Sequence, residues 1–73
     1  MWPQKSVRPQ VIVESKNLIN KPCRFQNERN FMWDGIVVAV IQPGLFVLDT
    51  GIVVLGRWLR EVDGKPVKVS VFK

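Results

Sequence analysis

The 73-residue chain contains no histidine and no tyrosine, and its only cysteine is Cys23. Without histidine, it lacks the usual base for a serine or cysteine nucleophile and the usual nitrogen ligand of zinc. A single cysteine excludes an internal disulfide, so we expect a cytoplasmic setting with Cys23 as a small buried apolar residue. The five glycines are scattered singly and form no phosphate-binding loop. These absences predict a protein without enzymatic activity, cofactor, metal site or small-molecule substrate.

Long apolar segments are also missing. The longest apolar run, residues 36–41, is too short to cross a bilayer, and the polar, proline-broken N-terminus is unlike a signal peptide. We therefore expect no membrane role. With 47% hydrophobic and 23% charged residues, the composition is typical of a folded module, and the length allows one small core. The predicted organisation is a mobile basic arm over residues 1–9 and a single β domain over residues 10–73.

Short β-branched runs between turn signals predict most of the strands. Residues 36–41, 45–48 and 52–55 form successive runs divided by Gln42-Pro43-Gly44 and Asp49-Thr50-Gly51. Strands are also expected at 11–13, at 23–26 and, from alternating valines, at 67–71, with a loop or single helical turn around residues 17–22. Residues 57–62 fit either a short helix or a strand with a bend at Gly56, and the strand is favoured. The expected core contains Phe25, Val38, Val40, Phe46, Leu48, Val53 and Leu55.

Five or six short strands joined by tight turns predict a mainly β fold. An antiparallel sheet of this size curls on itself because curling reduces the exposed edges. The expected architecture is a small curled antiparallel sheet or barrel, SH3-like, Sm-like or OB-like, preceded by the mobile basic arm.

The sharpest local motif is Leu48-Asp49-Thr50-Gly51, which resembles the catalytic signature of aspartic proteases. Those enzymes place most of their chain after this motif, whereas residues 52–73 are all that follow it here, and Ile52 occupies a position that is usually small. Between two β-branched runs the same residues are favourable turn residues, because aspartate can cap its own turn and glycine accepts a positive φ. We expect a turn and no peptide cleavage.

Charge is concentrated at both ends of the chain. Residues 1–30 carry six cations and two acids, residues 31–56 carry only Asp34 and Asp49, and residues 57–73 carry five cations and two acids. An excess of cations favours a negatively charged partner, although scattered cations can also serve solubility alone. Four aromatic residues, Trp2, Phe31, Trp33 and Trp58, lie beside polar residues at expected strand ends, where a ring can seal a barrel or act as an exposed anchor. The predicted partner-binding residues are Lys5, Arg8, Lys16, Arg24, Arg29, Arg57, Trp58 and Arg60.

One resemblance involves the segment Phe31-Met32-Trp33-Asp34-Gly35-Ile36-Val37, the run 45–48 and Val53-Val54-Leu55-Gly56-Arg57. In outline these segments are similar to the glycine-bent strand and the later apolar-glycine strand of Sm-like proteins. The resemblance covers roughly residues 20–62. It implies a small barrel that binds RNA or single-stranded DNA directly.

A second resemblance is one of size and character. The basic arm from Lys5 to Arg8, the strand-rich apolar middle and the missing catalytic groups resemble the small bacteriophage proteins that bind host RNA polymerase. This resemblance implies a transcription regulator that contacts the polymerase, for instance its β′ subunit, and inhibits initiation, promotes antitermination, or does both. Regulation of bacterial RNA polymerase by docking is the predicted function, with direct binding of nucleic acid as the alternative.

Overall fold

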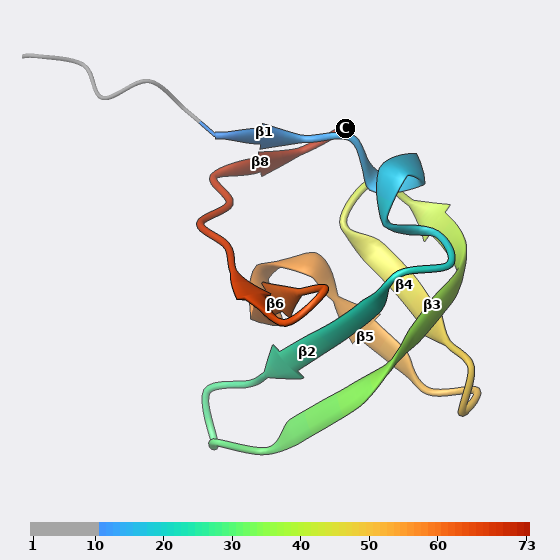
Figure 1. The fold of residues 1–73 in the computed structure, drawn as a ribbon, viewed down its shortest axis with the longest axis vertical. Helices are drawn as coiled ribbons and strands as arrows, with labels where there is room; N and C mark the ends of the chain where they lie inside the picture. The colour runs from blue at the N-terminus through green and yellow to red at the C-terminus, as the bar shows by residue number, and fades with distance from the viewer. Residues whose placement is uncertain (1–10) are drawn as a thin grey trace, which may run out of the picture.

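Six strands form one antiparallel sheet in the computed structural model, which describes residues 11–73 (Figure 1). The strands lie in the order β5-β4-β3-β2-β6-β7 and are β2 (Pro22–Gln26), β3 (Met32–Gln42), β4 (Leu45–Leu48), β5 (Val53–Leu55), β6 (Leu59–Val62) and β7 (Lys65–Pro66). The mainly β, curled antiparallel architecture is confirmed. Among the described residues β5 and β7 are unpaired edges, so the sheet is open and not a closed barrel. The expected arm, with Lys5 and Arg8, lies outside the described residues.

The curl of the sheet comes from the long strand β3. Its first half pairs with β2 and its second half with β4, and two irregularities in register, between Val37 and Ala39 and between Val40 and Gln42, bend the second half. Bulges of this kind increase the local twist of a strand. One strand therefore belongs to both halves of the sheet, and its two ends lie at opposite ends of the molecule.

The Asp49-Thr50-Gly51 segment is a tight turn between β4 and β5, as expected. Gly51 has a φ of +86° and donates its N–H to the Leu48 carbonyl at 2.8 Å. The Asp49 carboxylate does not cap its own turn, however, because its Oδ1 accepts the backbone N–H of Ile36 at 3.1 Å. The Asp49 N–H in turn donates to the Ile36 carbonyl at 2.8 Å, so that this aspartate joins the turn to β3.

The core lies on the concave face of the sheet and is sealed by aromatic rings. Phe25 and Phe46 are fully buried with ring centroids 6.1 Å apart, and Cys23 is buried beside them, as expected. Three of the expected core residues are wrong: Val38 and Val53 are about half exposed, while their neighbours Val37 and Val54 are buried, and Leu55 lies on the same face of β5 as Val53. The buried apolar residues are Leu18, Cys23, Phe25, Val37, Phe46, Leu48, Val54 and Leu59.

Short elements close the core at the other side. The 3-10 turn η1 (Ser15–Leu18) begins two residues before the segment 17–22 that was expected to be a loop or helical turn, and the rest of that segment is loop up to β2. The buried Ser15 hydroxyl accepts the Gly44 N–H at 3.1 Å. The strand β1 (Ile12–Val13) pairs in parallel with β8 (Val71–Phe72) in a separate two-stranded sheet. The strand expected over 67–71 is wrong for residues 67–70, which form no strand, and only Val71 belongs to β8.

The ambiguous segment 57–62 contains both alternatives. A 3-10 turn, η2 (Gly56–Trp58), leads into β6 at Leu59, so the favoured strand begins three residues after the bend. Gly56 is required for packing, since a Cβ there would lie 2.5 Å from the Phe72 ring and 3.0 Å from the Gly44 backbone. No helix within residues 11–73 is long and apolar enough to cross a membrane.

Candidate functional site

A row of three aromatic rings extends the concave face of the sheet beyond the core. Phe31 and Trp33 lie on or beside β3 at positions of the same parity, and Trp58 reaches them from η2. The Trp33 and Trp58 rings are stacked, with centroids 5.4 Å apart and planes 17° apart, and Phe31 lies 6.4 Å from Trp33. Both tryptophans pack against the core, whereas Phe31 is 61% exposed. We call these three residues the aromatic end.

The hairpin between β2 and β3, which projects from the rest of the sheet in Figure 1, positions the charges around these rings. Asn27 shapes its turn, because its side-chain oxygen accepts the N–H groups of Arg29 and Phe31 at 2.9 and 3.0 Å. Asn30 completes the turn with a φ of +66°. The two asparagines thus fix this turn locally, because asparagine accepts backbone hydrogen bonds through its side chain and tolerates a positive φ.

Glu28, in the same turn, connects the hairpin to η2. Its Oε1 accepts the Trp58 indole N–H at 3.3 Å and forms an ion pair with Arg57 at 3.4 Å. The pKa of Glu28 is lowered, first by a hydrogen bond from its own backbone and then by the Trp58 donor, with smaller effects from the charges of Arg57 and Arg60. Glu28 therefore orients the Trp58 ring and pairs with Arg57 beside it.

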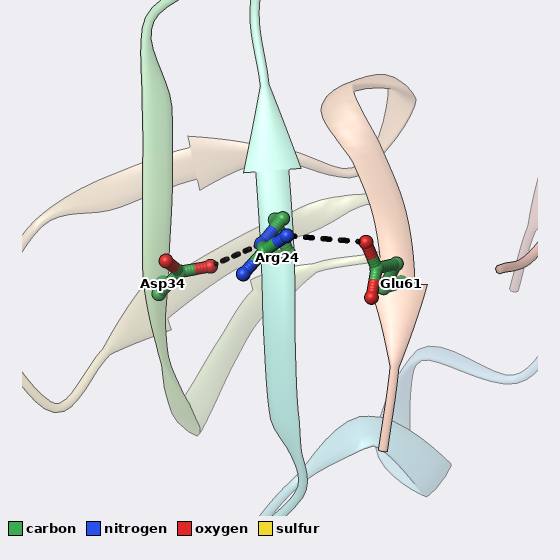
Figure 2. Close-up of polar contacts among 3 residues, drawn as sticks. All are labelled: Arg24, Asp34 and Glu61. Carbon is green, nitrogen blue, oxygen red and sulfur yellow. Dashed lines mark hydrogen bonds and ion pairs between the residues drawn. The ribbon is translucent and has the colours of Figure 1, made fainter. Parts of the chain in front are cut away.

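On the convex face, Arg24 is held by two carboxylates (Figure 2). It lies on β2 between Asp34 of β3 and Glu61 of β6, with N–O distances of 2.8 Å to Asp34 and 3.3 Å to Glu61. The strand registers place these three residues side by side. The hydrogen bond to Asp34, followed by the two negative charges, raises the pKa of Arg24. Its charge is thus balanced within the chain.

The structure brings together only part of the predicted binding set. Arg29, Arg57, Trp58 and Arg60 come from the β2–β3 turn, η2 and the start of β6, which meet at the aromatic end. Arg24 lies on the opposite face, within its carboxylate pairs. Lys16 lies on η1, beside Gln42 and Pro43, at the other end of β3.

The predicted set omitted Glu28 and the two rings on which Trp58 rests. Phe31 and Trp33 are potential anchors by sequence, and their i, i+2 spacing in a strand places them on one face. No sequence signal connects Glu28 with Trp58, because 30 residues separate them and the contact depends on the pairing of β2 with β6.

Reactive side chains and clusters of metal ligands are sparse among the described residues. Burial, with a smaller contribution from the charge of Asp63, raises the pKa of the Cys23 thiol to about 11, which disfavours the reactive thiolate. Within residues 11–73 no three histidine, cysteine, aspartate or glutamate side chains gather as metal ligands. The aromatic end, together with the arginines and Glu28 around it, presents a contact surface of rings, guanidinium groups and one carboxylate. Comparison of the chain with protein-family models, curated proteins and solved structures finds no match.

Proposed function

We propose that this protein is a non-enzymatic regulator that acts in the bacterial cytoplasm by docking its aromatic end on RNA polymerase. The observation that carries the proposal is the stacked Trp33–Trp58 pair, fixed by Glu28 and bordered by Phe31 and Arg57. Tryptophan and arginine dominate the binding energy of protein interfaces, and rings held rigid before binding lose little entropy when a partner covers them. The choice of polymerase as the partner rests on the resemblance to polymerase-binding phage proteins.

The charges around the rings favour a protein partner over a phosphate backbone. Arg57 already forms an ion pair with the Glu28 carboxylate, so an acid lies among the aromatic and cationic groups at this end. A surface that follows nucleic acid usually presents cations without interspersed acids, because each acid repels the phosphates. A mixed rim around buried rings is typical of protein interfaces, in which charges set association rate and specificity.

The net charge of +5 supports attraction of an acidic partner over long range. The anchoring contact is then made by the exposed ring of Phe31, which extends the stacked pair toward solvent. Removing this ring should mainly speed dissociation, whereas reversing the charge of Arg29 should mainly slow association.

Direct binding of single-stranded nucleic acid is the second candidate, and the exposure of Phe31 next to Arg29 favours it. An exposed ring stacks with any base, and such stacking contributes about 1–3 kcal/mol per base. The two candidates use the same residues but differ in partner and in their response to salt.

A titration with a matched pair of variants tests the proposal. Labelled protein is titrated with nuclease-treated core polymerase, isolated β′ subunit, duplex DNA and single-stranded RNA at several salt concentrations. Phe31→Ala should weaken polymerase binding at least about tenfold, equivalent to about 1.4 kcal/mol. Met32→Ala is the control, because Met32 is also exposed but points to the opposite face of β3.

Binding to polymerase that is lost in Phe31→Ala and retained in Met32→Ala supports the proposal. Micromolar or tighter binding to RNA or DNA, with none to polymerase and a linear fall of log affinity with log salt, refutes it in favour of the second candidate. Equal effects of the two substitutions would show that the aromatic end is not part of the interface. Transcription assays with a promoter and a terminator then distinguish inhibition of initiation from antitermination.

A further inference from the structure

The two edges of the six-stranded sheet differ in how they are protected. The β7 edge consists of Lys65 and Pro66, which are residues that block further strand pairing. The β5 edge has neither a charge nor a proline: it consists of Val53, Val54 and Leu55, and Val53 is 48% exposed. An apolar edge strand without such protection is a template for pairing with another strand.

The hydrogen-bond pattern shows which backbone groups of β5 are available. The Gly56 N–H donates to the Gly44 carbonyl at 2.6 Å, and the Leu48 N–H donates to the Ile52 carbonyl at 2.9 Å. Because bonded pairs alternate along an antiparallel ladder, Val54 is the residue of β5 that bonds with β4. The Val53 N–H and C=O groups and the Leu55 N–H group therefore point away from the sheet.

Among the residues that the structure describes, the strand positions on the convex face next to this edge are apolar. Ala39, Val47 and Val53 are cross-strand neighbours in one row, and Leu45 and Leu55 form the next row. The side chains of these strands that point the other way, Phe46, Leu48 and Val54, fill the core. No lysine or arginine occurs between Arg29 and Arg57, so the strands β3, β4 and β5 themselves carry no cation, and Lys16 and Lys73 lie only beside the end of β3 at Gln42 and Pro43.

We propose that a second copy of this chain covers the edge, with β5 pairing antiparallel to β5 about a two-fold axis. In this arrangement Val53 of each copy lies opposite Leu55 of the other, and each apolar row continues into its equivalent, as an isologous interface requires. Charge explains why a second copy fits here. Two chains of net charge +5 repel each other, and the half whose strands carry no cation is where they can approach with the least repulsion. The pairing is independent of the polymerase proposal, because it does not use the aromatic end.

Sedimentation equilibrium of the full chain over a wide range of concentration tests the pairing. The expected result is a monomer–dimer equilibrium between the 8.4 kDa chain and twice that mass. Val53→Lys should raise the dimer dissociation constant at least about tenfold, because the charge enters the interface twice. Val11→Lys is the matched control, since Val11 is 46% exposed but lies outside the sheet, and it should leave the constant unchanged.

Two further measurements keep the test valid if Val53→Lys disturbs folding. Val53→Pro removes an N–H that points away from β4 and should abolish the dimer while leaving the circular dichroism spectrum native. In the unmodified chain, the amides of Val53 and Leu55 should exchange with solvent more slowly as concentration rises. A chain that is monomeric at all concentrations, or a dimer that persists in both Val53 variants, overturns the proposal. If the Val53 and Leu55 amides are protected from exchange at every concentration, then residues 1–10 of the same chain cover the edge, and this result would also overturn the proposal.

Discussion

The contact between Gly35 and Asp49 makes a quantitative prediction about stability. A Cβ added at Gly35 would lie 2.8 Å from Asp49 Oδ1, the atom that accepts the Ile36 N–H, while its next neighbours would lie at an ordinary 3.4 Å. Gly35→Ala should therefore displace the carboxylate and break that one hydrogen bond. Because the bond is exposed to solvent, we assign it about 1 kcal/mol.

Alanine also stabilises a strand relative to glycine, by about 0.5–1 kcal/mol, because it restricts the unfolded chain. Gly35→Ala alone should thus cost little, at most about 0.5 kcal/mol, whereas Asp49→Ala alone should cost about 1 kcal/mol. Once the carboxylate has been removed, the new methyl group meets no obstacle. Gly35→Ala should then stabilise the Asp49→Ala variant by about 0.5–1 kcal/mol, and the two substitutions should show a coupling energy of about 1 kcal/mol.

Urea denaturation of the double-mutant cycle, followed by circular dichroism, measures these free energies of unfolding. Asp49→Asn is the control, because the amide retains an oxygen acceptor and should preserve most of the coupling. Additivity of Gly35→Ala and Asp49→Ala to within about 0.3 kcal/mol would refute the reasoning. Cleavage of a peptide by the purified protein, lost in Asp49→Ala, would instead restore the protease reading of the Asp-Thr-Gly sequence.

Three further predictions follow from burial and charge. Val54→Asp should unfold the domain, since a buried unpaired charge costs several kcal/mol, whereas Val53→Asp on the same strand should leave the monomer folded in thermal melts. The buried Cys23 thiol of the folded protein should react with a thiol reagent at pH 8 far more slowly than the same thiol in the unfolded protein. Because the pKa of Cys23 rises from 9.0 to about 11 on folding, the stability gained from the neutral thiol should be present below pH 9 and lost as the pH rises toward 11. Tryptophan fluorescence should change as Glu28 is protonated, and the midpoint of this change should lie below pH 4.5 because the pKa of Glu28 is lowered. Glu28→Gln should remove the transition. A transition that persists in this variant would show that another carboxylate causes it.

Strand content, turn positions and the central aromatic pair could all be predicted from the sequence, because each depends on local chemistry. Asn27 and Asn30, Pro43-Gly44 and Gly51 favour turns wherever they occur, and β-branched runs between turns favour strands. The burial of Phe25 and Phe46 was predicted correctly because each lies in a short strand whose length and pattern leave few alternatives.

Which valines face the core, and which distant residues meet, depends on how the strands pair in the folded chain. The uninterrupted run 36–41 has no polar residue to mark the outer face, and the bulge between Val37 and Ala39 shifts the alternation, so Val37 is buried in place of Val38. The contacts of Trp58 with Trp33 and Glu28 depend on the pairing of β2 with both β3 and β6, as does the position of Arg24 between Asp34 and Glu61. Such pairings join strands far apart in the chain. They are selected by burial of the whole core, which no local sequence pattern records.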